Sequence, residues 1–82
     1  MEEHREAARR RVLKAGKILL DGGGAIDCTV RNLSQTGAAL EVETPIGVPE
    51  RFGLMIEAGR TVPCKVVRRS ERRIGVRFVD DP

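Results

Sequence analysis

An arginine cluster near the start of the chain carries the groups best suited to binding an anion. Arg5 and Arg9 have the spacing RxxxR, and Arg10 and Arg11 follow directly. A guanidinium group is planar and can pair with two phosphate oxygens, bind the O6 and N7 atoms of guanine, or stack on a base. Arg5 and Arg9 would lie on one face of a helical turn, so both could contact the same ligand.

A polar motif with the spacing NxSxxG begins 23 residues after Arg9 (32 − 9), and its members are Asn32, Ser34 and Gly37. Short polar side chains of this kind commonly bond their own backbone in turns. The same residues also offer short polar side chains beside exposed backbone amides, and the glycine would let a flat ring approach the backbone. Each motif is common alone, whereas the pair in this order and at this separation is specific.

The composition leaves few groups for catalysis or metal binding. The 82 residues include one histidine, His4, and no tyrosine or tryptophan, so general acid–base groups are scarce. Cys28 and Cys64 do not form a CxxC pair, and with one histidine they cannot supply four zinc ligands. We therefore expect no catalytic residue, no metal and no cofactor, and we interpret both cysteines as buried, reduced thiols.

Charge and hydropathy indicate a cytoplasmic protein. No apolar run approaches the ~20 residues that span a bilayer, and the first eleven residues are too charged for a signal peptide. We therefore expect no membrane insertion. Fifteen Lys and Arg against 12 Asp and Glu give a net charge of +3, which favours an anionic partner without requiring one.

The distribution of apolar residues predicts six short strands. From Val12 onward apolar and polar residues alternate, the pattern of strands with one buried face. Residues 32–37 interrupt the alternation and are predicted to form a turn. The runs cover residues 12–20, 26–31, 38–43, 52–57, 62–67 and 74–79.

We expect an all-β fold in which residues 12–82 form a six-stranded antiparallel barrel, because closure leaves no free strand edge. Residues 1–11 have little to bury and are predicted to form a flexible basic arm.

The two motifs and the strand pattern together resemble the PilZ domain family, the bacterial receptors for cyclic di-GMP. The stretches VLKAGKI, DCTVRNLSQTGAALEV and RRIGVRFVD also carry the resemblance, which covers nearly the whole chain. It implies a stand-alone receptor that binds cyclic di-GMP, as an intercalated dimer of the nucleotide, and performs no chemistry. The residues to which it assigns ligand binding are Arg5, Arg9, Arg10, Asn32, Ser34 and Gly37.

The roles implied by the resemblance differ between the two motifs. Arg5 and Arg9 would bind phosphates and stack on guanine, with Arg10 assisting, while the NxSxxG residues would receive a guanine edge. The sequence departs from the family pattern in two respects. It stops at Asp81-Pro82 without the C-terminal helix of many relatives, and Arg68 stands near where some relatives place an aromatic residue that stacks on guanine. We expect Arg68 to stack in its place.

The expected mechanism is a switch. Nucleotide binding would order the arm over the barrel, and a partner protein would read that change, with the receptor acting as a monomer or weak dimer. One alternative is a PilZ-like adaptor that no longer binds nucleotide. Another is a small nucleic-acid-binding barrel. The absence of outward aromatic residues argues against it, since Phe52 and Phe78 are both predicted to face inward.

A second basic group lies on the last hairpin. We interpret it as a solvent-facing surface, with an acidic partner site as the alternative. It comprises Arg68, Arg69, Arg72, Arg73 and Arg77.

Overall fold

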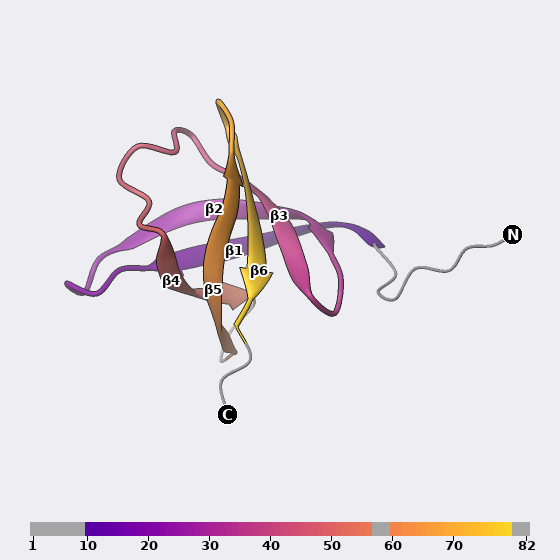
Figure 1. The fold of residues 1–82 in the computed structure, drawn as a ribbon, viewed down its shortest axis with the longest axis horizontal. Helices are drawn as coiled ribbons and strands as arrows, with labels where there is room; N and C mark the ends of the chain where they lie inside the picture. The colour runs from indigo at the N-terminus through magenta and orange to yellow at the C-terminus, as the bar shows by residue number, and fades with distance from the viewer. Residues whose placement is uncertain (1–9, 57–59, 80–82) are drawn as a thin grey trace, which may run out of the picture.

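The computed structural model describes residues 10–56 and 60–79. This part of the chain contains six strands and no helix (Figure 1). The strands are β1 (Arg10–Leu19), β2 (Ala25–Leu33), β3 (Gly37–Glu41), β4 (Arg51–Ile56), β5 (Thr61–Arg69) and β6 (Arg73–Phe78). The described residues therefore include no helix that could span a bilayer.

The strands close into a barrel in the order β1-β2-β3-β6-β5-β4, with every neighbouring pair antiparallel. Four pairs are hairpins, and the pairs β3–β6 and β1–β4 join the two halves of the chain (Figure 1). The predicted six-stranded antiparallel barrel is therefore confirmed. β1 begins at Arg10, two residues before the expected start of the barrel, and the predicted flexible arm falls mostly on residues 1–9, outside the described part.

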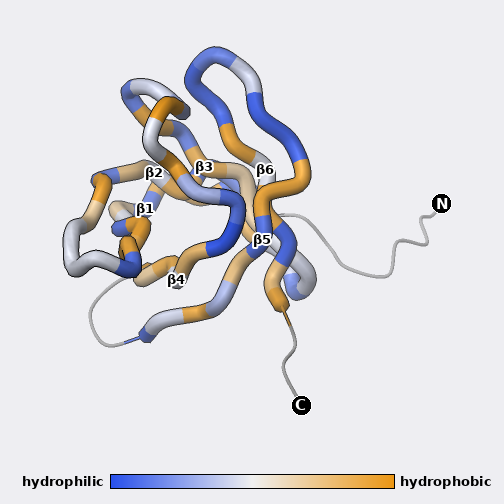
Figure 2. The backbone as a smooth tube through the Cα atoms, turned by 60° about the vertical axis from the view of Figure 1, so that its left-hand side comes forward, coloured by the Kyte–Doolittle hydropathy of each residue, from blue (hydrophilic) through white to orange (hydrophobic). Residues whose placement is uncertain are grey.

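The core forms from the inward face of every strand, and Figure 2 shows the alternating hydropathy along the backbone that produces it. The side chains with the least exposure are Ile18, Val30, Leu40, Leu54, Cys64 and Ile74. Val48, from the irregular segment between β3 and β4, is buried with them. Aliphatic burial of this kind stabilises the fold by roughly 1.5–3 kcal/mol for each large side chain.

The predicted turn at residues 32–37 is wrong at its start. β2 continues through Asn32 to Leu33, so that only residues 34–36 lie outside the strands. A β-bulge between Val30 and Asn32 shifts the register and allows the strand to continue pairing with β3. The period-two pattern breaks at the bulge, which is why the sequence suggested that the strand ended there.

Both cysteines are free thiols in the core, as expected. The pKa of each is raised from 9.0 to about 11, and burial is the largest cause. For Cys28, the Asp27 carboxylate also contributes to the raised pKa, and Lys17 opposes it. For Cys64, the nearby Cys28 adds to the effect of burial on the pKa. Both thiols are therefore protonated and unreactive near neutral pH.

Stability should fall in alkaline solution because of these thiols. They ionise near pH 9 in the unfolded chain and near pH 11 in the barrel. Between these values the folded state binds more protons, so the free energy of unfolding decreases as the pH rises. Urea unfolding at a series of pH values from 7 to 10.5 measures this slope. A Cys28→Ala/Cys64→Ala variant should be less stable at pH 7 but show a flatter slope above pH 9; an unchanged slope would contradict the assignment.

Candidate functional site

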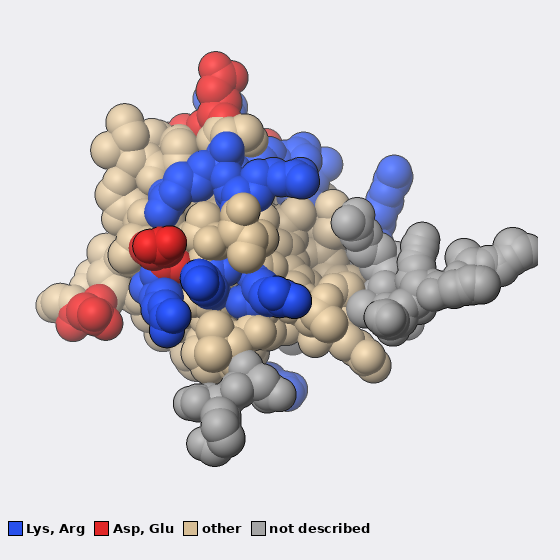
Figure 3. Space-filling model, in the orientation of Figure 1, with Lys and Arg blue, Asp and Glu red and all other residues tan. Residues whose placement is uncertain are grey.

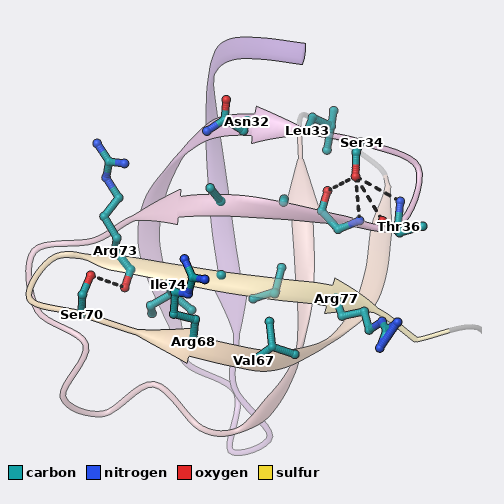
Figure 4. A pocket seen from close by; sticks show the side chains of 15 residues that line it. Asn32, Leu33, Ser34, Thr36, Val67, Arg68, Ser70, Arg73, Ile74 and Arg77 are labelled. Carbon is teal, nitrogen blue, oxygen red and sulfur yellow. Dashed lines mark hydrogen bonds between the residues drawn. The ribbon is translucent and has the colours of Figure 1, made fainter. Parts of the chain in front are cut away.

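A groove of about 800 Å³ crosses the outer face of β2, β3, β6 and β5 (Figure 4). It is lined by polar residues of the 34–37 turn, by basic residues of the β5–β6 hairpin, and by small residues between them. These strands bring two regions distant in sequence onto one surface. Of the residues predicted to bind ligand, Asn32, Ser34, Gly37 and Arg68 line this groove.

One cross-strand row forms the base of the groove. Asn32 is registered opposite Ala39, Ala39 opposite Gly75, and Gly75 opposite Arg68. Directly opposed residues project from the same face of a sheet. Ala39 and Gly75, which we call the groove floor, therefore lie between an amide and a guanidinium group. Three interstrand spacings of ~4.8 Å separate the outer two strands, so the row spans about 14 Å.

Two bulges determine that the polar ends of this row face outward. Strict alternation would place Asn32 on the inward face with Val30, and Arg68 on the inward face with Val66. The register shifts between Val30 and Asn32 and between Val66 and Arg68, so both polar side chains emerge on the groove side. Burying either group unpaired would be costly. In the sequence, each bulge could have been inferred from a polar residue, Asn32 or Arg68, at a position where regular alternation requires an inward apolar one.

An exposed apolar side chain of β5 also lies beside the floor. Val67 is 60% exposed and lines the groove. A Cβ atom placed on Gly75 would lie 3.5 Å from Cβ of Arg68 and 4.0 Å from Cγ2 of Val67, which are ordinary contacts. Figure 4 shows Val67 and Arg68 on the same side of the groove. A flat ring on the floor would thus have an apolar neighbour and a guanidinium group within reach.

Ser34 closes the polar turn. Its Oγ atom accepts hydrogen bonds from the backbone N–H groups of Thr36 and Gly37, both at 3.2 Å, and lies 3.3 Å from the Gly37 carbonyl oxygen (Figure 4). The Ser34 N–H also donates to the Gly37 carbonyl oxygen at 2.9 Å. These bonds use both lone pairs of the hydroxyl, so Ser34 shapes the turn at the groove edge.

Gly37 is needed for close approach of two strands. A Cβ atom at this position would collide with the carbonyl oxygen of Val76 in β6, a backbone atom that cannot move aside easily. From the sequence, this glycine was expected to leave room for a ligand ring. In the structure, the Val76 carbonyl oxygen lies where a Cβ atom would be, and Gly37 also lines the groove.

The arginine cluster is only partly within the described residues. Arg5 and Arg9 lie outside them, and only the backbone of Arg10 is described, opposite Leu33 in β2. Arg11 is registered opposite Asn32 and is exposed, so it extends the row at the base of the groove onto β1. The chain therefore enters the barrel beside the NxSxxG motif.

Three residues of the row or its edge were not singled out from sequence: Ala39, Val67 and Gly75. Arg11 was identified as part of the arginine cluster but was not assigned to ligand binding. A signal existed for two of the three. Ala39 and Gly75 are small residues at outward positions of strands whose other outward positions carry charged side chains such as Glu41 and Arg77. A glycine within a strand has no side chain to pack and often marks the close approach of a ligand or of another backbone.

The groove is electropositive. Arg68, Arg73 and Arg77 line it, and none of the residues that line it is acidic. The Glu41 carboxylate, which lies opposite Arg73 in the register, accepts from Arg31 at 2.9 Å. Among the described residues no cluster of three or more His, Cys, Asp or Glu could hold a metal ion. The arrangement suits an anionic ligand with flat rings.

Two glycine variants should separate the structural glycine from the groove glycine. Gly37→Ala places a methyl group against the Val76 carbonyl oxygen and should lower the free energy of unfolding by about 2–3 kcal/mol. Gly75→Ala places the same group in open groove and should leave stability unchanged or raise it by about 0.5–1 kcal/mol. Urea denaturation measures both. Equal effects of the two substitutions would contradict the different roles.

Comparisons with known proteins identify the family from the sequence and the fold from the structure. The family model of the PilZ domain matches residues 3–82. The fold is similar to a solved structure described as the PilZ domain with c-di-GMP of YcgR from Escherichia coli, with a TM-score of 0.75 and 18% identity, covering 95% of this chain and 79% of that chain. Curated proteins give no match. The family expected from the sequence motifs is confirmed, and the chain belongs to the PilZ domain family.

Proposed function

We propose that this protein is a receptor for cyclic di-GMP and binds the nucleotide in the groove over β2, β3, β6 and β5. The observation that carries the proposal is the cross-strand row, with Ala39 and Gly75 between Asn32 and Arg68. Family membership and the nucleotide named with the E. coli PilZ domain support the same ligand. The groove has the size of a small-molecule site.

The chemistry of the ligand matches the residues around the groove. A guanine ring would lie on the groove floor, with Val67 as its apolar neighbour and the guanidinium plane of Arg68 available for stacking. The Asn32 side chain, which makes no hydrogen bond to another described residue, would bind a guanine edge. The two phosphates would be bound by arginines of the RxxxR motif.

The position of β1 supports a contribution from that motif. Arg9 is bonded directly to Arg10, whose backbone is registered opposite Leu33, one residue from Asn32. The motif therefore joins the barrel at the end of the groove that carries the NxSxxG residues. Arginines contributed by this segment would bind the phosphates from above the floor, and binding would fix the segment over the groove for a partner protein to read.

Calorimetric titration with cyclic di-GMP tests the proposal. The wild-type protein should show saturable binding. Arg9→Ala and Arg68→Ala should each weaken it by roughly tenfold to a hundredfold, because a contact between arginine and phosphate or guanine contributes about 1.5–3 kcal/mol. Gly75→Val should abolish binding, because the valine side chain fills the groove floor while a β-branched residue suits a strand.

Controls decide between the receptor and its alternatives. Arg60→Ala removes an exposed arginine just before β5, away from the groove, and should bind as the wild type does. GMP in place of cyclic di-GMP should bind much more weakly, because one base and one phosphate make half the contacts. No heat from the wild-type protein would identify an adaptor that does not bind nucleotide. Unchanged binding by Gly75→Val would place the ligand elsewhere.

A further inference from the structure

Three exposed cations form a straight row across the outer surface of β4, β5 and β6. Arg51 is registered opposite Lys65, and Lys65 opposite Arg77. Residues in direct register project from one face of a sheet, so the three side chains are neighbours. We call them the basic row. Figure 3 shows that basic side chains gather over these three strands on the viewed face of the molecule.

The basic row breaks the charge pairing used elsewhere on this barrel. Lys17 and Asp27 are in direct register and form an ion pair at 2.6 Å, and Arg31 pairs with Glu41 across β2 and β3 at 2.9 Å. Like charges directly opposite each other destabilise a sheet. No member of the basic row forms an ion pair with another residue that the structure describes. A cost to stability without a local compensation is typical of a binding surface.

The spacing of the basic row matches the acidic face of a helix. Directly opposed residues on neighbouring strands have Cα atoms about 4.5–5.5 Å apart. Carboxylates four residues apart on a helix have Cβ atoms about 5–6 Å apart, whereas alternate residues of an extended strand are about 6.6 Å apart. Three acids at i, i+4 and i+8 of a helix lying across the strands could therefore each reach one member of the row.

Other anionic partners fit this surface less well. Single-stranded nucleic acids are usually held by aromatic stacking, but Phe52 is buried and Phe78 packs against the core, and these are the two aromatic residues of the chain. Insertion into a membrane needs apolar residues beside the charges. The large exposed apolar side chains in the described ranges are Leu13, Ile46 and Val67, none of which belongs to the row.

We propose that the basic row is a docking site for an acidic helix of a partner protein. Arg77 belongs to the row and also lines the groove, so the docked helix would lie beside the nucleotide site. The proposal does not depend on nucleotide binding, since the row consists of residues held in register by the barrel itself.

The test uses a synthetic helical peptide of alanine and glutamine with a glutamate at every fourth position. Titration at low ionic strength should shift the backbone amide resonances of Arg51, Lys65 and Arg77 in NMR spectra of the full chain. Lys65→Glu should weaken binding about tenfold, because it replaces the central attraction by repulsion. Arg60→Glu makes the same change of charge outside the row and should alter binding by less than about twofold.

Two further measurements distinguish a docking site from a row of charges that has no binding partner. An isomeric peptide with its glutamates distributed around the helix should bind more weakly than the patterned one. Lys65→Glu should raise the urea midpoint of the free protein, because two repulsive cross-strand pairs become attractive, which also shows that the variant is folded. Arg60→Glu should not raise it.

Several results would overturn the proposal. If the patterned and isomeric peptides bound equally well, the attraction would be nonspecific. The same would follow if the patterned peptide bound equally well to the wild type and to Lys65→Glu. Tighter binding of mixed-sequence RNA or of anionic phospholipid vesicles than of the peptide, with loss in Lys65→Glu, would assign the row to that partner instead. Titration of the same variants with cyclic di-GMP is a separate readout. If cyclic di-GMP did not bind, the proposed receptor function would be contradicted, and the conclusion from peptide binding would be unaffected.

Discussion

The pairing of β3 with β6 is the interaction on which both the barrel and its groove depend. It joins the β2–β3 hairpin to the β5–β6 hairpin through the pairs from Gly37–Arg77 to Glu41–Arg73. Gly37 permits it, because any Cβ atom there would collide with the backbone of β6. Only this pairing makes Ala39 and Gly75 neighbours. The same pairing is therefore needed both to close the barrel and to form the groove floor, and an error in register at β3–β6 would disrupt both.

Bulges resolve a conflict between packing and binding on the same strands. The core requires Val30 and Val66 to face inward, and regular alternation would then turn Asn32 and Arg68 inward as well. One extra residue in β2 and one in β5 keeps the core contacts and brings the polar side chains out. The polar groups of the groove thus stand on paired strands, and strands hold a binding geometry more firmly than a free loop does.

The sequence predicted what depends on local pattern and missed what depends on register. Alternation identified six strands and inward residues such as Leu54 and Ile74, because burial imposes period two on each strand separately. It could not show that Asn32 lies in a strand, since the bulge interrupts the period at that point. Nor could it show that Gly75 lies between Ala39 and Arg68, because neighbours across a sheet are set by strand order and register, which no single segment encodes.

The sheet carries two surfaces of different design that meet at Arg77. In the groove, small residues at the centre of the row leave space that a ring can fill; in the basic row, long side chains fill the surface and offer only charge. Arg77 belongs to both. A dianion bound in the groove would lie within about one Debye length of the row and lower its positive potential. An acidic partner would then bind less tightly when the groove is filled, and by linkage the nucleotide would bind less tightly when the partner is docked. A shared residue on a rigid strand can therefore couple the two sites without any change in the fold of the barrel.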